Sequence, residues 1–267
     1  MFENIILGAI QGITEWIPVS SKACIIAARI HLFHNTGTLN ELINYALFLH
    51  LGTALAAIIY FREDIAKIFS ACGDLKNPAS EGRKILIFLV TVTVFTAFGQ
   101  VLVTKASDLA HRAPHAKAAI TCIIAALLIV AGFLQLKTKT EGKRETKDLT
   151  LIDGIILGIV QAFTCLPGLS RAGTTMAALA VRNFDKEHTL KLSFLMSIPV
   201  ILLGNIIKNH HLLLSARSEW LGVLTAFVVG MLSIGVLMNF VKKVNFGGFL
   251  IFIGSILAVA TILGAID

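Results

Sequence analysis

Two short stretches of this chain place residues that can handle protons and phosphate inside otherwise apolar sequence. The first contains Gln11 and Glu15, whose spacing of four residues puts both side chains on one face of a helix. The second contains Ser170 and Arg171 just after a Pro-Gly pair, where a helix is expected to begin with Ser170 as its N-cap. Ionisable residues in apolar surroundings usually face a cavity and pair with a partner or a ligand. Glu15 can therefore move a proton or hold a cation, and Arg171 can bind an anion such as phosphate.

Neighbouring polar and small residues complete the set of candidate site residues. The catalytic candidates are Glu15, Ser21, Ser170 and Arg171. The substrate-binding candidates are Gln11, Ser20, Lys22, Gly168, Gly173, Thr174 and Thr175. Two further candidates are Cys24, for which inert packing is the alternative, and His50, for which a hydrogen-bonded core histidine is the alternative. Glu15 is also the candidate ligand of a divalent cation such as Mg²⁺ or Ca²⁺, and we expect no organic cofactor.

The two stretches are copies of one motif. Residues 5–23 read IILGAIQGITEWIPVSSKA and residues 155–172 read IILGIVQAFTCLPGLSRA. With one residue deleted, they share Ile-Ile-Leu-Gly, then Gln, Thr and Pro, and a final Ser-Lys/Arg-Ala. This repetition predicts one site built from two halves. The structural alternative is a simple ion pair between Glu15 and Arg171, which does not explain the surrounding hydroxyls and glycines.

Composition indicates the environment in which these motifs work. The 267 residues are 56% hydrophobic and 15% charged, where a soluble domain carries roughly a quarter charged residues. Mean hydropathy is +0.82, and apolar residues cluster in stretches long enough to cross a hydrocarbon core. A chain in lipid must satisfy its own backbone hydrogen bonds, so these stretches are helical. The net charge of +7 lies mainly in the connections, which is typical of membrane topology and argues against nucleic-acid binding.

The apolar stretches predict an all-α integral membrane protein. Three continuous spans follow each motif, at 43–60, 85–104 and 116–136, and at 190–207, 220–240 and 247–265. The motif stretches, about 3–33 and 151–182, have two short apolar halves separated by a polar break near a proline, which interrupts a helix. Each is either a re-entrant hairpin or one long broken span. The basic loops 61–84 and 137–148 lie on the same side of the membrane, which is the cytoplasmic side by the positive-inside rule. If the second motif is a hairpin, the basic residues that follow it also lie on the cytoplasmic side, which favours the hairpin.

Three crossings between the motifs make the two halves inverted-topology repeats. We expect one polytopic domain over residues 1–267, with repeat 1 at about 1–136, a cytoplasmic basic linker at about 137–148 and repeat 2 at about 149–267. Each half is a re-entrant broken helix pair followed by three transmembrane helices. Broken helices of such repeats normally meet near the bilayer midplane to form a site.

These motifs resemble those of a known family. QGITEWIPVSS together with PGLSRAGTT is similar to the two signature motifs of the undecaprenyl-diphosphate phosphatase family, also known for bacitracin resistance. LHLGTALA, YFRED and FLMSIP resemble further stretches of that family. The resemblance implies a multi-pass protein of the plasma membrane that hydrolyses a C55 polyprenyl diphosphate to its monophosphate, which recycles the lipid carrier of cell-envelope glycan synthesis. It implies an essential acid at Glu15 and phosphate-handling roles for Ser21, Ser170, Arg171 and Thr175.

Two positions depart from the family pattern, and they keep a second function class open. Cys24 stands where the family usually has a histidine, and Ala172 stands where a serine is usual. The alternative function is a transporter or flippase for a lipid phosphate or a small anion, because inverted repeats with broken helices are also typical of transporters. The partners expected are the polyprenyl diphosphate and the bilayer, and a homodimer is considered.

Overall fold

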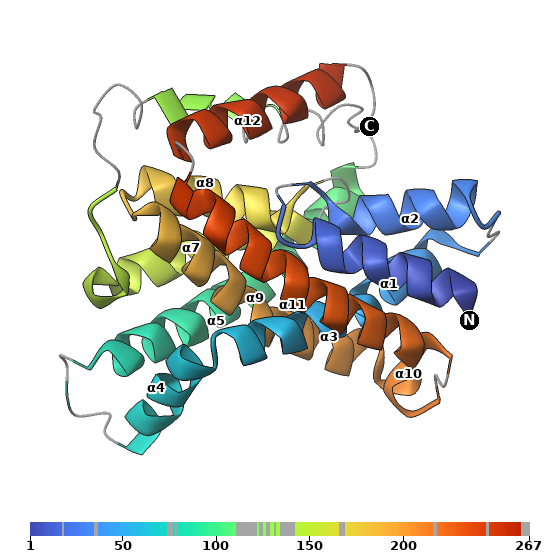
Figure 1. The fold of residues 1–267 in the computed structure, drawn as a ribbon, viewed down its shortest axis with the longest axis horizontal. Helices are drawn as coiled ribbons and strands as arrows, with labels where there is room; N and C mark the ends of the chain where they lie inside the picture. The colour runs from blue at the N-terminus through green and yellow to red at the C-terminus, as the bar shows by residue number, and fades with distance from the viewer. Residues whose placement is uncertain are drawn as a thin grey trace. The chain divides into compact units, whose positions relative to one another are not determined.

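In the computed structural model, the regular elements of the described part of the chain are helices, with one isolated β-bridge between Arg144 and Phe184 (Figure 1). That part comprises residues 1–17, 19–34, 37–73, 77, 80–110, 142–165, 169–215, 218–243 and 246–262, with scattered residues between 122 and 133. The chain forms two compact units. Unit 1 is Met1–Arg62 with Phe194–Leu237, and unit 2 is Glu63–Ser193 with Met238–Asp267. Each unit therefore takes helices from both halves of the sequence.

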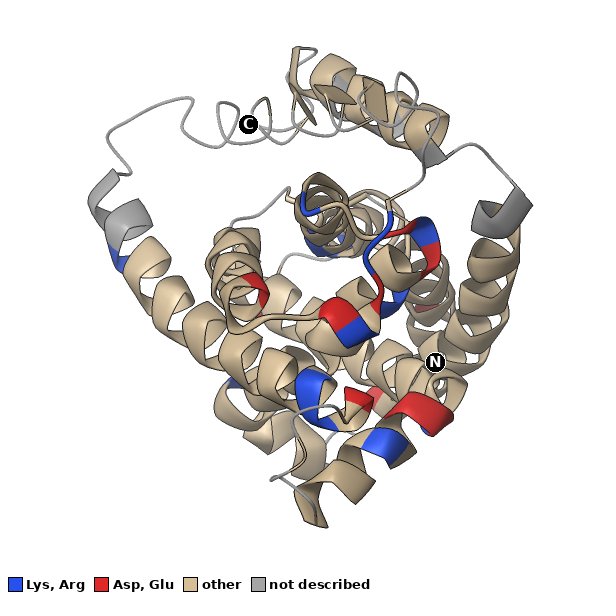
Figure 2. Cartoon of the chain, turned by 90° about the vertical axis from the view of Figure 1, so that its left-hand side faces the viewer, with Lys and Arg blue, Asp and Glu red and all other residues tan. Residues whose placement is uncertain are grey.

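Four of the described helices are long and apolar enough to cross a membrane. They are α3 (Leu39–Tyr60), α5 (Glu81–Ala110), α9 (Lys186–Lys208) and α11 (Glu219–Lys243). Much of the ribbon in Figure 2 carries no charged residue, as a lipid-facing surface requires. These helices confirm the all-α membrane fold. Of the other two predicted spans, 247–265 corresponds to α12 (Phe246–Ile262), and 116–136 lies mostly outside the described residues.

Both motif copies form two short helices with a break between them. The first copy forms α1 (Phe2–Thr14) and α2 (Ser21–His31), and the second forms α7 (Leu151–Ala162) and α8 (Arg171–Val181). A helix of 11–13 residues is roughly 20 Å long, too short for a hydrocarbon core of about 30 Å. The two helices of each pair contact each other, as Figure 1 shows for α1 and α2. Each motif is therefore a helical hairpin, and the inverted orientation of the two stays a prediction.

In unit 1, glycines let the first hairpin pack tightly on α11. A Cβ atom on Gly12 of α1 would lie 2.8 Å from the backbone nitrogen of Gly230. Trp16 donates from Nε1 to the carbonyl of Gly230 at 3.1 Å, and Ser233 donates from Oγ to the carbonyl of Gly12 at 2.6 Å. Small residues allow this approach between apolar helices, where hydrogen bonds add to the packing. The end of α1 is thereby fixed against α11.

In unit 2, the second hairpin packs on α5 in the same manner. A Cβ atom on Gly154 of α7 would lie 2.8 Å from Cβ of Thr91. Thr96 donates from Oγ1 to the carbonyl of Gly158 at 3.2 Å. The supporting helix again comes from the other half of the sequence, because α5 lies in the predicted first repeat and α7 in the second. Each hairpin therefore rests on a helix encoded in the opposite half.

An acidic residue at the start of each hairpin is paired with an arginine near its end. In unit 1, Glu3 Oε1 lies 3.1 Å from Nε of Arg29. In unit 2, Asp153 Oδ1 lies 2.8 Å from Nε of Arg182. The other carboxylate oxygen, Oδ2, lies 2.6 Å from Nη2 of Arg144. These pairs tie the first turn of one helix to the end of the other. Arg144 in addition anchors part of the predicted basic linker to α7.

The connections contain more structure than the sequence predicts. The predicted loop 61–84 includes a further helix, α4 (Arg62–Gly73), and η1 (Thr146–Asp148) precedes α7. A 3₁₀ turn, η2 (Phe163–Cys165), ends the first half of the second motif, and α10 (His210–Ser215) follows α9. Treating 61–84 as a simple loop is therefore wrong.

Candidate functional site

The predicted site residues of the first motif form a buried cluster in unit 1, which we call the Glu15 cluster (Gln11, Glu15, Ser21, His50 and Thr53). Gln11, fully buried on α1, donates from Nε2 to Glu15 Oε2 at 2.9 Å. Glu15 is the C-cap residue of α1 and stays in the right-handed helical conformation, so the predicted shared face is confirmed. Only 6% of Glu15 is exposed. A carboxyl group in such an environment needs several partners.

The break between α1 and α2 brings Ser21 back to the same carboxylate. Ser20 caps α2 by accepting a hydrogen bond from the backbone nitrogen of Ala23 at 3.4 Å, and Ser21 is the first residue of that helix. Its hydroxyl donates to Glu15 Oε2 at 2.8 Å. Ser21 is thus held, nearly buried, beside a group that can accept its proton.

His50 of α3 completes the cluster. Its Nδ1 lies 2.6 Å from the carbonyl of Ala46 and must donate there, because a carbonyl only accepts. Its Nε2 lies 3.1 Å from Glu15 Oε2 and 3.3 Å from Ser21 Oγ. Because Nδ1 carries a proton, Nε2 and the carboxyl oxygen of Glu15 are both acceptors unless one of them is protonated. Their short contact therefore requires a proton that the two atoms share. The Glu15–His50 pair can therefore both give and take a proton.

Thr53 is a member of the cluster that the sequence prediction missed. Its hydroxyl donates to the carbonyl of His50 at 3.0 Å and accepts from Gln11 Nε2 at 3.2 Å. Thr53 lies three residues after His50, so the two polar residues share one face of the predicted span 43–60. This spacing was the sequence signal that could have identified Thr53. Thr53 fixes Gln11, which in turn holds Glu15.

The predicted residues of the second motif form a separate group in unit 2, which we call the Arg171 cluster (Ser170, Arg171, Thr174, Thr175 and Ser193). Ser170 is the N-cap of α8, as predicted, and its Oγ accepts from the backbone nitrogen of Gly173 at 3.1 Å. Thr174 donates to the carbonyl of Ser170 at 2.8 Å. Arg171 therefore begins a capped helix, whose N-terminus adds partial positive charge.

Arg171 is oriented by a residue outside both motifs. Its Nη1 donates to the carbonyl of Ser193 on α9 at 2.8 Å. Thr175 Oγ1 lies 2.9 Å from the carbonyl of Arg171 and 2.6 Å from Ser193 Oγ. Ser193 is fully buried and lies next to the FLMSIP stretch. A guanidinium on the first residue of a helix, in a cluster that also holds hydroxyl groups, is chemistry suited to a phosphate group.

The other predicted residues lie on α2 or outside the described part of the chain. Lys22 and Cys24 are both half-buried on α2. Gly168 lies outside the described residues. Glu15 belongs to unit 1 and Arg171 to unit 2, so their joint site stays a prediction.

The two motif copies share a local arrangement. Gln161 occupies the place in the second copy that Gln11 has in the first, and it donates from Nε2 to Thr96 at 3.3 Å. Gln11 makes the equivalent bond to Thr53. Each of the two amide oxygens is buried and has no hydrogen-bond partner in the described structure. Cys165 of the second copy corresponds to Glu15 of the first, so the second copy has no carboxylate at this position.

The described residues bear on whether the protein can hold a divalent cation. Among the residues that the structure describes, no group of three or more His, Cys, Asp or Glu side chains could hold a metal ion. The Glu15 cluster nevertheless offers hard oxygen donors, the carboxylate and the unpartnered Oε1 of buried Gln11. Mg²⁺ is commonly held by one or two carboxylates together with substrate phosphates. The donor set fits such a cation, provided that phosphate oxygens complete it.

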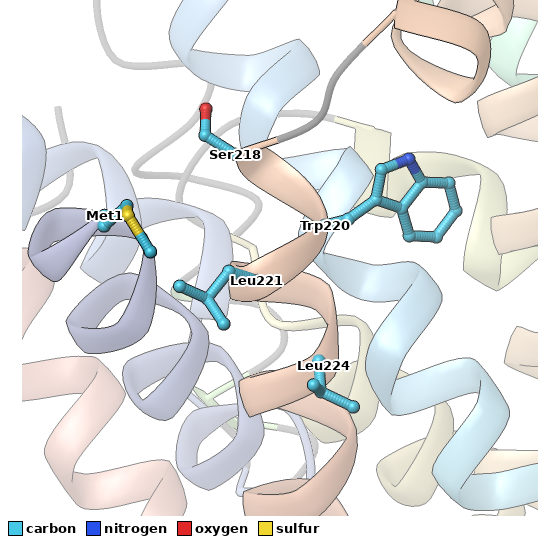
Figure 3. A pocket seen from close by; sticks show the side chains of 5 residues that line it. All are labelled: Met1, Ser218, Trp220, Leu221 and Leu224. Carbon is cyan, nitrogen blue, oxygen red and sulfur yellow. The ribbon is translucent and has the colours of Figure 1, made fainter.

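An open apolar groove in unit 1 lies apart from this chemistry. Its volume is about 520 Å³, and it is lined by Met1, Ser218, Trp220, Leu221 and Leu224 (Figure 3). Four of these residues lie at the start of α11 or just before it, and none belongs to either motif. The groove is therefore not a candidate phosphate site.

Comparisons with known proteins agree over nearly the whole chain. The model of the family described as "Bacitracin resistance protein BacA" matches residues 4–260. The chain is 34% identical over 264 residues to a protein of Methanococcoides burtonii named undecaprenyl-diphosphatase, with 97% of both chains covered. It is 31% identical over 271 residues to a Moorella thermoacetica protein of the same name, covering 100% of this chain and 97% of the relative. A Haloarcula marismortui protein, also named undecaprenyl-diphosphatase, is 32% identical, covering 91% and 90%.

Proposed function

Since this chain belongs to the bacitracin resistance protein BacA family, we propose that it hydrolyses undecaprenyl diphosphate to undecaprenyl phosphate and inorganic phosphate. The chain is a multi-pass protein of the plasma membrane, as its four long apolar helices and its membership of this family together indicate. The reaction recycles a lipid carrier for cell-envelope glycan synthesis. The observation that carries the proposal is the buried contact of Glu15 with both Ser21 and His50.

The Glu15 cluster supports a role in proton transfer. The attacking oxygen belongs either to Ser21 or to water. In both cases its proton passes to the Glu15–His50 pair as the oxygen bonds to the terminal phosphorus, and the bond from that phosphorus to the bridging oxygen breaks. Undecaprenyl phosphate leaves. If Ser21 attacks, water then cleaves the phosphoserine, releasing phosphate and restoring the hydroxyl.

The Arg171 cluster supports a role in binding and charge stabilisation. Phosphoryl transfer depends mainly on positioning and on electrostatic stabilisation of the transferred group. The Arg171 fork and the N-terminus of α8 supply positive charge, and the cap formed by Ser170 keeps that helix end in place. We assign both clusters to one reaction because the sequence repeats the motif that carries them.

A divalent cation, if bound, would be held by Glu15 and Gln11. It would neutralise charge on the diphosphate, which is the usual contribution of metal ions in phosphoryl transfer. The residues of this chain would then orient the carboxylate, through the hydrogen bond from Gln11 Nε2 to Glu15. Dependence of the reaction on added cation is tested by phosphate release with and without a chelator.

The transporter alternative is not favoured. All three relatives named above are hydrolases by name, and each is similar over nine-tenths or more of this chain. The buried Glu15–Ser21–His50 contact also suits bond cleavage, whereas transport alone needs no nucleophile beside a proton acceptor.

Phosphate release from undecaprenyl diphosphate by the detergent-purified chain tests the proposal. We expect the wild-type protein to release one phosphate per lipid, and Arg171→Ala and Glu15→Ala each to lower turnover at least about 100-fold. His211→Ala serves as the control, because this exposed side chain lies outside both clusters. Binding of the lipid by the wild-type protein without phosphate release would refute hydrolysis and restore the transporter alternative.

A further inference from the structure

Ser193 is linked to Arg171 in two ways, although it belongs to neither motif. It lies on α9 within unit 2 and is fully buried. Its backbone carbonyl accepts from the Arg171 guanidinium at 2.8 Å. Its hydroxyl lies 2.6 Å from Thr175 Oγ1, which lies 2.9 Å from the backbone carbonyl of Arg171. One residue of α9 therefore contacts the side chain of Arg171 directly and its backbone through one intermediary.

The direction of this hydrogen-bond chain follows from the number of protons available. Thr175 has one hydroxyl proton, and two carbonyls, of Arg171 and Ala172, lie within 2.9 and 3.3 Å of its oxygen. A carbonyl only accepts, so Thr175 donates its proton to the backbone. Ser193 must then donate to Thr175. The Ser193 hydroxyl is consequently the first donor in a chain that ends at Arg171.

This arrangement restricts a side chain that is otherwise flexible. A free arginine has about 2 kcal/mol of rotamer entropy, and its fork matches phosphate only when its plane is correctly oriented. The hydrogen bond at Nη1 restricts the orientation of that plane, and the hydrogen bond at the backbone carbonyl restricts the start of the side chain. Preorganisation of this kind favours the transition state, where charge on the phosphoryl group is redistributed.

We propose that Ser193 is a positioning residue for Arg171, so that its hydroxyl raises the turnover of the phosphatase without contacting the substrate. The inference rests on the proposed function. It predicts that Ser193→Ala, which removes the hydroxyl and keeps the carbonyl, lowers kcat about 5- to 10-fold and leaves KM within about 2-fold. A purely structural role predicts a lower melting temperature with kcat unchanged.

Ser197→Ala is the matched control. Ser197 lies four residues further along α9, is also buried, and donates only to the carbonyl of Phe194 at 2.6 Å in the same helix. Both substitutions delete one buried hydroxyl from the same helix. Ser197→Ala should keep kcat at the wild-type value, with a similar effect on the melting temperature.

A double-mutant cycle with Thr175 tests the connection directly. Thr175→Val removes the hydroxyl but keeps the shape, and the double variant with Ser193→Ala should be no slower than Thr175→Val alone, because both changes interrupt one chain. Thr175→Ser, which keeps the hydroxyl, should restore most of the turnover. Independent, multiplying losses, or equal kcat for Ser193→Ala and Ser197→Ala, would overturn the inference. An inactive wild-type protein would instead overturn the proposed function, and this inference with it.

Discussion

The Nε2 atom of His50 lies 3.1 Å from Oε2 of Glu15, and its other ring nitrogen is held 2.6 Å from the carbonyl of Ala46. The tautomer is thus set by a backbone group of the same helix, α3. Because Nδ1 is the committed donor, the side of the ring that faces Glu15 and Ser21 is the side that exchanges a proton. A glutamine at position 50 could keep a hydrogen bond but could not exchange that proton.

His50→Gln should therefore lower turnover about 100-fold or more, the usual contribution of a positioned acid–base group. Phosphate release from undecaprenyl diphosphate is the measurement, with folding checked by gel filtration in detergent. His31→Gln is the control, since His31 is exposed at the end of α2. Equal rates for the two variants would show that His50 is a core histidine without a chemical role.

Gly12→Ala should reduce both stability and activity. The new methyl group would lie 2.8 Å from the backbone nitrogen of Gly230, so α1 must shift away from α11. Overpacking of this kind costs about 1–3 kcal/mol and would move Gln11, the neighbouring residue on α1. Melting temperature and phosphate release are both measured. Gly73→Ala is the control, because a Cβ there meets nothing within 4 Å, and equal melting temperatures would contradict the tight α1–α11 contact.

Asp153→Asn should destabilise the protein strongly. The carboxylate is fully buried and pairs with Arg144 and Arg182, whose side chains are 22% and 34% exposed. Breaking a buried pair costs about 3–5 kcal/mol, and access of water to the arginines reduces this to about 2–3 kcal/mol. Glu3→Gln breaks the corresponding pair of the first hairpin, where the carboxylate is 33% exposed, and should cost at most about 1 kcal/mol. Thermal unfolding in detergent distinguishes the two, and a smaller effect at Asp153 would refute this ranking.

The same aspartate predicts a loss of stability in acid. Burial alone would raise the pKa of Asp153, but hydrogen bonds from Arg144, Thr150 and Arg182 outweigh it and hold the pKa well below its usual range. The lowered pKa stabilises the fold fully above the unfolded value of about 4, and this contribution disappears as the pH falls further. Hydrogen bonds from His188 outweigh burial in the same way and lower the pKa of Asp185, which adds a smaller effect. Melting temperature should fall between about pH 5 and 3, and more shallowly in Asp153→Asn; parallel curves would contradict this.

The helices and the motif breaks could be predicted because their signals are local. Apolar stretches of sufficient length predicted α3, α5, α9 and α11. The polar breaks in the two motifs predicted the paired short helices. The N-cap role of Ser170 and the shared helical face of Gln11 and Glu15 follow from neighbours in the sequence, and both are confirmed.

The remaining parts of both clusters depend on contacts between distant segments. Ser193 lies 22 residues from Arg171, and Thr53 lies 42 residues from Gln11. A single serine or threonine in an apolar helix gives no sign of its partner. The role of Asp153 at the start of α7 could be predicted in part, because Thr150 and Asp153 have the spacing of a capping box. The two arginines that pair with Asp153 could not be predicted from the sequence.

The contact between the first hairpin and α11 has a consequence for biosynthesis. Trp16 and its partner Gly230 are 214 residues apart, so the ribosome needs roughly 10–40 s to reach the second after the first, at about 5–20 residues per second. During that time the glycine-lined side of α1 lacks its native neighbour. An N-terminal fragment that ends before α11 should therefore be a substrate for membrane proteases, whereas co-expression of the missing helix should protect it.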